Sequence, residues 1–526
     1  MTKFTGCGFG HPKLLSSCCA RGDVETWRLG RLPSTPGSIS WPENHAVPSQ
    51  NLSSMERSSA TPHFLFVTTP MQGHINPARR LAARVMALMP DARVTFSTAI
   101  GGHRLMFPSL VTPDEETVDD AGVLYVPYSD GFDEGFRPEV HGRGTYKERA
   151  RAVGRETLSA VVAGLAVRGR PVTCMVYAFL VGWAAHVARA HGIPAALYWI
   201  QPAAVFAVYY HYFHGHDALI ASCANDANPD AAVELPGLPP LRSSTLPSVV
   251  SITSPEQPHY LLLDMMRDLF LALDEYKPKV LVNTFDALEP DALRAVAEFE
   301  LVAVGPVVPD EASPSSADLF RRDDGKGYME WLDTKPARSV VYVSFGSFLS
   351  MSKRQEEETR RGLEATGRPY LWVARKGAGE CATLDGGDDD GMRAQGVVVE
   401  WCDQVKVLSH PAVGCFVTHC GWNSTLESVT SGVPMVAVPQ WTDQPTVAWL
   451  VEARMGVGVR ARADGEGAVD RGELQRCVET ILGDGEAASG IRAQADLWRV
   501  RAEEAIAGGG TSERNLRAFA LGCALT

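Results

Sequence analysis

The sequence predicts an α/β protein with two doubly wound domains in tandem, facing each other across a cleft. Apolar runs of strand length alternate with segments of helical spacing along most of the chain, which is typical of βαβ units and a parallel sheet. The alternation pauses at a segment rich in proline, serine and charge (304–327), which indicates an inter-domain linker. A chain of 526 residues is also too long for a single hydrophobic core, since domains usually have about 100–200 residues.

The first half of the chain (55–303) contains the elements of one such domain. Strands are predicted at 63–70, 92–99, 172–179 and 195–200, and helices at 77–89 and 182–192. Because each helix follows an apolar strand, right-handed βαβ units and a parallel sheet are expected.

The second half resumes the alternation after the linker. Strands are predicted at 339–347, 370–375, 397–401, 414–419 and 434–439, with a helix at 353–366. These elements would form a second domain (328–494), followed by a helical segment (495–526) with a charged helix at 495–520. Ligands of doubly wound folds bind outside the C-terminal ends of the strands, so the cleft is the expected binding site.

The first 54 residues differ in character from the rest. They are rich in serine, proline and glycine, and they lack both periodicity and the apolar core of a secretory signal. Either they are a disordered leader, or the start is mis-assigned and Met55 is the true first residue. We favour the second interpretation because the first strand begins a few residues after Met55.

Charge and cysteine content argue against several classes of protein. A formal net charge of −13, with no block rich in lysine or arginine, argues against a nucleic-acid-binding protein. The 11 cysteines are scattered without a C-x-x-C pair, which favours a reducing compartment over a disulfide framework or a zinc site. No apolar run reaches the ~18–20 residues of a membrane span. We therefore expect a soluble, cytoplasmic monomer.

One segment joins a strand to a helix through a glycine. The strand is predicted to end at His419, Gly421 permits a tight turn, and Ser424 with Glu427 has the S-x-x-E spacing of a capping box. The helix is predicted to end at residues 431–432, ahead of a proline. Free N–H groups at such a helix start suit an anionic diphosphate.

The surrounding block, residues 401–444, carries a family resemblance. It reads WCDQVKVLSHPAVGCFVTHCGWNSTLESVTSGVPMVAVPQWTDQ. It closely resembles the 44-residue signature of plant family 1 UDP-sugar-dependent glycosyltransferases in its length, its opening W-C/A-x-Q, its HCGWNS core and its closing DQ. The resemblance extends over residues 55–526. It implies the GT-B fold, in which two Rossmann-like domains face each other across a cleft, and sugar transfer to a small molecule.

The resemblance also assigns a donor site. The residues implied are Trp401, with Cys402 beside it, for the uracil; Gln404 and Glu427 for the ribose hydroxyls; Ser347, His419, Asn423 and Ser424 for the diphosphate; and Trp422, Asp443 and Gln444 for the sugar. An indole offers a stacking face, a carboxylate and an amide bind diols, and a helix N-terminus stabilises departing UDP. Glutamine at position 444 resembles enzymes that use UDP-glucose, whereas histidine there often accompanies galactose use.

The segment TTPMQGHINPARR (68–80) places a histidine between a strand and a helix. With Asn76 predicted as the N-cap and Pro77 as the first helical residue, His74 would lie just before the helix, at the cleft. A lone histidine there is more often a hydrogen-bonded loop residue, but TPMQGHINP resembles the family motif that holds the catalytic histidine. The resemblance implies that neutral His74 takes a proton from the acceptor hydroxyl.

Many family members pair this histidine with an aspartate, and here the matching position is Ala178 in CMVYAFLVGWAA. The missing carboxylate would otherwise fix the tautomer and stabilise the imidazolium. Asp130, Asp133 and Tyr177 are alternatives that the sequence does not rank. Carboxylic acids and acidic phenols need less help from a base. The texture VYAFL…WIQPA resembles a subgroup that contains anthocyanidin 5-O-glucosyltransferases, crocetin glucosyltransferases and hormone-ester-forming enzymes.

The acceptor side offers one candidate wall. The aromatic, histidine-rich stretch 205–215 is either a buried helix or a wall of an apolar acceptor pocket. The three aspartates at 388–390 lie in a Gly/Asp loop rather than directly after a strand, so no metal site is predicted and transfer without a metal or other cofactor is expected.

The leading hypothesis is an inverting UDP-glucose-dependent glucosyltransferase that makes O-glucosides or glucose esters of a small plant metabolite. The acceptor would be a flavonoid or anthocyanidin, another phenol, or a carboxylic acid such as a hormone or an apocarotenoid. The alternative is a UDP-sugar-binding protein with lost or weak transfer, which the alanine at 178 makes plausible. A dinucleotide-dependent oxidoreductase is rejected because no G-x-G-x-x-G follows the first strand.

Overall fold

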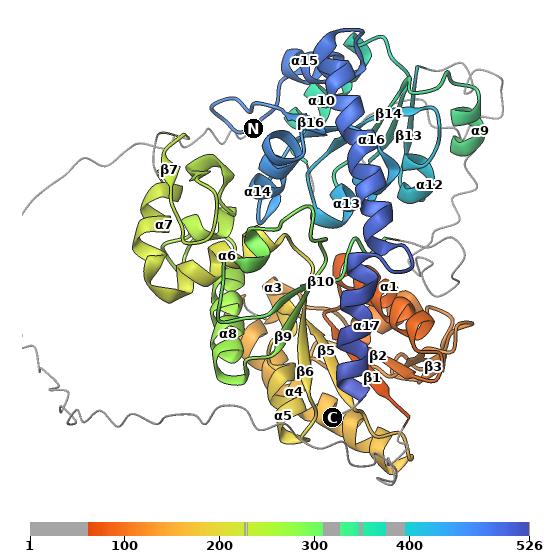
Figure 1. Ribbon diagram of the computed structural model, residues 1–526, viewed down its shortest axis with the longest axis vertical. Helices are drawn as coiled ribbons and strands as arrows, with labels where there is room; N and C mark the ends of the chain where they lie inside the picture. The colour runs from red at the N-terminus through yellow and green to blue at the C-terminus, as the bar shows by residue number, and fades with distance from the viewer. Residues whose placement is uncertain are drawn as a thin grey trace, which may run out of the picture. The chain divides into compact units, whose positions relative to one another are not determined.

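Two parallel sheets, each covered by helices, form the centre of the protein (Figure 1). The computed structural model describes residues 61–308, 327–346, 351–374 and 395–524, apart from residues 142, 226, 227 and 229. The predicted α/β class with two Rossmann-like domains is confirmed.

The first sheet has eight strands in the order β10-β9-β6-β5-β1-β2-β4-β3, all parallel except the β3–β4 pair. Its strands are β1 (His63–Thr68), β2 (Arg93–Thr98), β3 (Thr117–Val118), β4 (Leu124–Tyr125), β5 (Cys174–Ala178), β6 (Ala195–Trp199), β9 (Lys279–Val282) and β10 (Leu301–Ala303). The four predicted strands agree with β1, β2, β5 and β6 to within two residues at each end. Every residue of β1 and β5 is buried, as expected for strands covered on both faces.

Helices and one small hairpin accompany this sheet. The helices are α1 (Gln72–Leu88), α2 (Ile100–Met106), α3 (Pro138–His141), α4 (Tyr146–Val167), α5 (Ala184–Ala190), α6 (Ala203–His211), α7 (Asp217–Ala224) and α8 (Tyr260–Tyr276). Strands β7 (Ala232–Val233) and β8 (Leu241–Arg242) form an antiparallel pair outside the sheet. Helix α5 packs against both α4 and α8.

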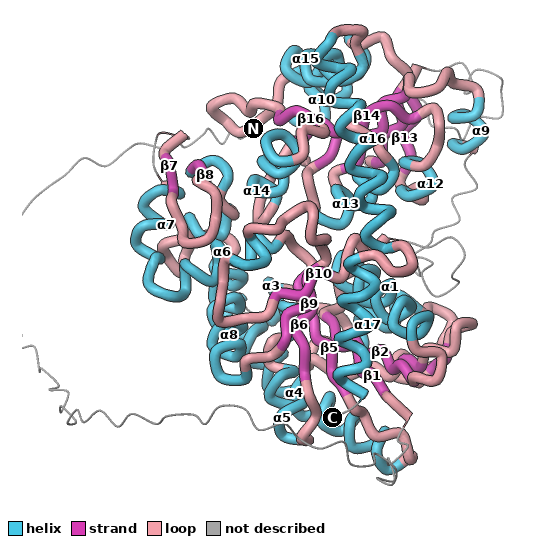
Figure 2. Tube along the Cα trace, viewed as in Figure 1, coloured by secondary structure: helices cyan, strands magenta, loops and turns pink. Residues whose placement is uncertain are grey.

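The second sheet has six parallel strands in the order β13-β12-β11-β14-β15-β16 (Figure 2). They are β11 (Val340–Ser344), β12 (Tyr370–Val373), β13 (Gly396–Val399), β14 (Val413–Thr418), β15 (Met435–Ala437) and β16 (Gly458–Arg460). The accompanying helices are α9 (Tyr328–Asp333), α10 (Lys353–Ala365), α12 (Gln404–Leu408), α13 (Trp422–Ser431), α14 (Gln444–Trp449), α15 (Arg471–Leu482) and α16 (Glu486–Ile506). Along β11, Val340 and Tyr342 enter one core cluster and Val341 and Val343 the other, because successive strand residues face opposite sides.

The start of α1 differs from the predicted start at Pro77. The helix begins at Gln72, and Met71 is its extended N-cap. The Met71 carbonyl accepts the N–H groups of His74 and Ile75 at 2.9 Å each, so a first turn forms before the proline. His74 therefore lies inside the first turn of the helix rather than ahead of it.

The predicted C-terminal helix at 495–520 is also wrong, because the structure has two helices there. Helix α16 ends at Ile506, and α17 (Thr511–Ala524) begins after three glycines. Gly509 has φ of 82°, which a right-handed helix does not accept. The glycines thus allow the chain to change direction.

Helix α17 packs on the first sheet instead of the second (Figure 1). Leu516 and Phe519 belong to the hydrophobic cluster of the first domain. Asn515 donates to the Ala303 carbonyl at 2.9 Å, and the sulfurs of Cys174 and Cys523 lie 2.9 Å apart. The end of the chain therefore completes the first core.

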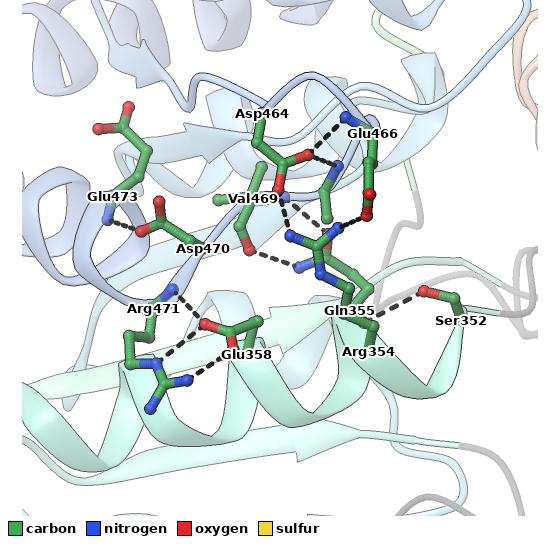
Figure 3. A network of polar contacts seen from close by, with 11 residues as sticks. Ser352, Arg354, Gln355, Glu358, Asp464, Glu466, Val469, Asp470, Arg471 and Glu473 are labelled. Carbon is green, nitrogen blue, oxygen red and sulfur yellow. Dashed lines mark hydrogen bonds and ion pairs between the residues drawn. The ribbon is translucent and has the colours of Figure 1, made fainter.

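A polar network fastens α10 to the segment before α15 (Figure 3). The buried Gln355 accepts the N–H of Val469 at 2.9 Å and donates to the carbonyl of Val469 at 3.0 Å. Arg354 bridges Asp464 and Glu466 at the surface. In the part of the chain that the structure describes, no helix is long and apolar enough to cross a bilayer.

Candidate donor and catalytic site

The N-terminus of α13 forms the centre of the site. Strand β14 ends at Thr418, and Gly421 is the N-cap of α13 without any side-chain cap. The predicted Ser424–Glu427 capping box is therefore wrong, because both residues lie inside the helix and bond other side chains. The predicted helix end is confirmed, with Gly432 at φ of 67° as the C-cap. The uncapped first turn leaves backbone N–H groups for an anion.

His419 lies between two glycines at this helix start. A Cβ at position 346 would come within 2.8 Å of the imidazole, and a Cβ at position 421 within 2.5 Å of Nε2, so only glycine fits at either place. Burial lowers the pKa of His419 to about 4, and its Nδ1 has no hydrogen-bond partner among the described residues. The ring is therefore neutral at cellular pH. Ser347, predicted beside it, lies outside the described residues.

The two residues predicted for the ribose bond each other directly. Gln404 donates from Nε2 to Glu427 Oε2 at 2.8 Å and to Ser424 Oγ at 2.9 Å. The Tyr342 hydroxyl donates to Gln404 Oε1 at 3.1 Å. Glu427 also forms a buried ion pair with Arg80 of α1 at 2.8 Å. The amide and the carboxylate are thereby held side by side, an arrangement that suits a diol.

Trp401 and Cys402 lie in the turn between β13 and α12. Trp401 is partly exposed, so its indole keeps accessible surface for stacking. Cys402 is buried, with its sulfur 3.4 Å from the Tyr342 hydroxyl. Its sulfur thus contacts β11, and Tyr342 connects it to Gln404.

Trp422 is the first residue of α13 and is almost fully buried. Its indole N–H donates to the carbonyl of Asn283, just after β9, at 2.7 Å. The side chain therefore anchors α13 to the first domain. The predicted contact between Trp422 and the sugar stays a prediction.

Asp443 and Gln444 lie together at the start of α14. Burial raises the pKa of Asp443 to about 6, and hydrogen bonds from Thr442 and Gln201 act in the opposite direction. The side-chain oxygen Oε1 of Gln444 accepts the backbone N–H groups of Gln440 at 2.8 Å and Trp441 at 3.1 Å. These bonds fix the orientation of the side-chain amide.

His74 is buried in the first turn of α1. Its ring packs on Phe179 with centroids 4.8 Å apart, and its Nδ1 has no hydrogen-bond partner among the described residues. Burial lowers the pKa of His74 to about 4. Phe179 directly follows Ala178, where many relatives of the predicted family carry the aspartate. An aromatic ring, and not a carboxylate, thus contacts the imidazole.

The three alternatives to that aspartate have other partners or none. Asp130 accepts the N–H of Phe132 at 2.9 Å, and burial raises its pKa. Asp133 accepts the Ser129 hydroxyl at 2.7 Å. Tyr177 is fully buried, which raises the pKa of its phenol well above the usual value. No described hydrogen bond joins any of the three to His74.

Two contacts bring the first turns of α1 and α13 together. Asn423 donates from Nδ2 to the Gly73 carbonyl at 2.9 Å. Pro77 has no N–H, so it cannot make the helical bond to that carbonyl, which leaves an acceptor for the other domain. The second contact is the Arg80–Glu427 ion pair. The turn that carries His74 therefore faces the helix start that carries the predicted diphosphate ligands.

A cavity of about 210 Å³ lies at the C-terminal ends of β1, β4 and β5, and His74 is not among its lining residues. Thr69 and Pro70 line it beside β1, Asp130 beyond β4, and Lys147 and Arg151 from α4. No sequence motif predicted that residues of α4 line this cavity. The spacing of Lys147, Arg151 and Arg155 is helical, however, and would have placed the three cations on one face of a helix.

The stretch 205–215, predicted as a buried helix or as a pocket wall, does not line this cavity. Every residue of α6 (Ala203–His211) is buried, which supports the buried-helix alternative for that part. Among the described residues, no group of three histidine, cysteine, aspartate or glutamate side chains is arranged to hold a metal ion. The aspartates at 388–390 lie outside the described residues.

Comparison with known proteins points to one family. A family model described as UDP-glucoronosyl and UDP-glucosyl transferase matches residues 317–486. A crocetin glucosyltransferase of Gardenia jasminoides, named as chloroplastic, is 43% identical over 471 residues, covering 87% of this chain and 96% of that protein. An anthocyanidin 3-O-glucoside 5-O-glucosyltransferase of Perilla frutescens is also 43% identical, covering 86% of this chain and 97% of that protein.

Solved structures agree with this similarity. The crystal structure of Os79 from O. sativa in complex with UDP superposes with a TM-score of 0.71 at 30% identity, covering 87% of this chain and 100% of Os79. A UDP-glucose:anthocyanidin 3-O-glucosyltransferase in complex with UDP gives a TM-score of 0.73 at 25% identity, covering 89% of this chain and 99% of the other.

Proposed function

This chain belongs to the UDP-glucosyl transferase family, and we propose that it transfers glucose from UDP-glucose to a small plant metabolite with inversion at the anomeric carbon. The observation that carries the proposal is the contact between Asn423 and the Gly73 carbonyl. It joins the turn with the candidate base to the helix start with the candidate diphosphate ligands. Base and leaving group would therefore act on opposite ends of one reaction axis.

On the donor side, UDP would lie across the start of α13. Trp401 would stack on the uracil. Glu427 would accept hydrogen bonds from the ribose hydroxyls, and Gln404 would accept from them or donate to them. Asn423 and the N–H groups of the uncapped first turn would stabilise the negative charge that grows on the leaving UDP. Asp443 and Gln444 would bind the glucose hydroxyls.

On the acceptor side, neutral His74 would take the proton of the acceptor hydroxyl as its oxygen attacks the anomeric carbon. The new C–O bond forms while the bond to UDP breaks, and UDP leaves with the electron pair. A base with a pKa of about 4 is weak, and no carboxylate stabilises its protonated form. Carboxylic acids are already ionised at cellular pH, and acidic phenols ionise near it without a strong base. These are therefore the acceptors that this site suits best.

The relatives agree with both acceptor classes. One is named for crocetin and another for an anthocyanidin 3-O-glucoside. We place the acceptor in the cavity beside Thr69 and Pro70, because it lies at the C-terminal ends of the strands and these two residues come just before the helix that carries His74. The alternative function, a UDP-sugar-binding protein without transfer, is favoured by His74 Nδ1, which has no hydrogen-bond partner among the described residues.

An acceptor screen separates the two functions. The protein, started at Met55, would be incubated with UDP-[14C]glucose and a panel of phenols and carboxylic acids. We expect labelled products that vanish for phenols in His74→Ala and persist in part for carboxylic acids. His191→Ala, an exposed histidine of the same domain, is the matched control and should retain full activity. Binding of UDP-glucose without any labelled acceptor would establish the binding protein instead.

The cellular location and the oligomeric state belong to the same proposal. We propose that the protein is a monomer and that it is cytoplasmic, the location because its scattered cysteines suit a reducing compartment. The Gardenia relative is named as chloroplastic, so a fluorescent fusion of the full chain in leaf cells, compared with a fusion started at Met55, is the direct test. Plastid fluorescence of either fusion would contradict the cytoplasmic assignment.

A further inference from the structure

One buried ion pair connects the two domains at the donor site. Arg80 of α1 lies 347 residues before Glu427 of α13 in the sequence, yet its Nη1 donates to Glu427 Oε1 at 2.8 Å. The side chains are only 9% and 8% exposed. The carboxylate that the proposed function assigns to the ribose is thus held from the opposite domain.

The hydrogen bonds of Glu427 leave room for a ligand. Oε1 accepts from Arg80, and Oε2 accepts from Gln404 at 2.8 Å. A carboxylate has about four lone-pair positions, so each oxygen retains capacity for one more donor. Two ribose hydroxyls are donors of that kind.

The charged contact with Arg80 fixes the position of this carboxylate. A hydrogen bond from a guanidinium to a carboxylate is stronger and more directional than one from a neutral donor. Gln404, Ser424 and Tyr342 contact the same network but carry no charge. In the described part of this network, Arg80 is the cation in contact with Glu427.

Arg80 also has a property that stability alone does not explain. Its Nε is buried without a hydrogen-bond partner among the described residues. Buried donors are nearly always paired, so an unpaired one calls for an explanation. Arg80 lies on the same helix as His74, so the ion pair ties Glu427 to the helix that carries the candidate base.

We infer that Arg80 is a positioning residue for the donor: it orients the Glu427 carboxylate toward the ribose hydroxyls and couples ribose binding to the helix that carries His74. The inference rests on the proposed function, in which Glu427 binds the ribose. It adds a residue of the acceptor-binding domain to the recognition of the nucleotide.

The test compares UDP with 2′-deoxy-UDP as competitive inhibitors, in the wild type and in Arg80→Met. We expect the wild type to prefer UDP by a factor of about 10 or more, since a hydrogen bond to a charged group is lost with the 2′-hydroxyl. In Arg80→Met the preference should shrink to about 2-fold or less, because Glu427 is no longer held in place. Arg80→Lys, which keeps the charge, should restore part of the preference.

Arg84→Met is the matched control. Arg84 lies one turn further along α1 and donates to the carbonyl of Val304 at 2.6 Å, away from Glu427. It should keep the full preference for UDP. A merely structural role of Arg80 would weaken both nucleotides equally and leave the ratio unchanged, which would overturn the inference.

Two further outcomes separate this inference from the proposed function. A wild type that does not distinguish UDP from 2′-deoxy-UDP contradicts the ribose role of Glu427 itself. If Arg80→Met does not fold, Arg80→Lys takes its place, because it keeps a cation opposite Glu427 without the geometry of the guanidinium. It should fold with a preference for UDP below that of the wild type, and an unchanged preference would again overturn the inference.

Discussion

Each candidate catalytic side chain has its ionisation set by burial. His74 lies against Phe179 and no carboxylate is hydrogen-bonded to its Nδ1, so the pKa of the imidazole falls to about 4. The same desolvation acts on His419 beside the diphosphate site. Both rings are neutral at cellular pH, where one can accept a proton and neither repels a neighbouring cation.

The acid limb of the activity profile should therefore lie at unusually low pH. With UDP-glucose saturating, we expect kcat/KM for a phenolic acceptor to hold as the pH falls through 6.5 and to decline only toward about 4, because neutral His74 persists down to its own pKa. A decline centred near pH ~6.5, the ordinary value for histidine, would contradict this.

The same shift makes stability depend on pH. Between the folded pKa of about 4 and the unfolded value of ~6.5, the unfolded chain binds more protons at His74. The free energy of unfolding should therefore fall as the pH drops through this window. Urea titrations of the wild type and of His74→Gln should show a smaller fall for the variant, by up to about 3 kcal/mol.

Asp443 shows the opposite sign. Its folded pKa of about 6 exceeds the ordinary aspartate value of 3.8, so the folded state binds the proton more tightly and stability falls as the pH rises through this range. Asp443→Asn should raise the free energy of unfolding at pH 7 by up to about 3 kcal/mol, and it should raise the KM for UDP-glucose. The stability gain should shrink near pH 4, and an equal gain at both pH values would contradict the burial explanation.

At the scale of elements, the polar contacts of α10 include one that is buried and one that is exposed, and we expect them to contribute differently to stability (Figure 3). Gln355 is buried and satisfies both backbone groups of Val469. The Arg354 side chain is 47% exposed, and its partner Glu466 is 81% exposed. If the buried contact of Gln355 is lost, solvent does not reach the freed polar groups. If the exposed contact of Arg354 is lost, solvent hydrates both partners.

We expect Gln355→Leu to lower the free energy of unfolding by about 1–3 kcal/mol, because it strands a buried N–H and a buried carbonyl. Arg354→Met should lower the free energy of unfolding much less, because solvent screens its ion pairs. Urea titrations at low and high salt measure both. If the arginine variant were the less stable of the two, the surface ion pairs would matter more than burial suggests.

At the scale of the whole molecule, the chain crosses between its two sheets and then returns. Helix α16 packs on α13 of the second domain, and α17 packs on β10 and α1 of the first. Because α1 carries His74 and Arg80, the last helix of the chain supports the helix that joins the acceptor side to the donor side.

The cysteines at the end of this return path report on it. The sulfurs of Cys174 and Cys523, 349 residues apart, lie 2.9 Å from each other, close enough to form a disulfide after a small movement. Treatment with diamide should oxidise this pair, each thiol losing a hydrogen to the reagent, and mass spectrometry of a non-reducing digest should detect the linked peptides. Cys523→Ser should abolish the link and Cys223→Ser should not. Full alkylation of Cys174 and Cys523 after diamide would show that α17 does not dock as described.

Much of the site was readable from local patterns. The apolar runs predicted strands such as β1 and β14, and the spacing of glycine and polar residues predicted the helix that starts after His419. These features depend on residues close together in the sequence, whose conformational preferences act over a few positions. The resemblance of 401–444 likewise needed only the order of its residues.

The sequence alone was therefore enough to predict the α/β fold class, the family and the residues of the candidate donor site. Only the tertiary structure decided that α1 starts before Pro77, that Ser424 and Glu427 bond side chains instead of capping a helix, and that α17 completes the first core. It also paired Arg80 with Glu427 and put Phe179 against His74. Arg80 and Glu427, for example, are 347 positions apart, and such contacts depend on how whole helices pack, which no local pattern encodes.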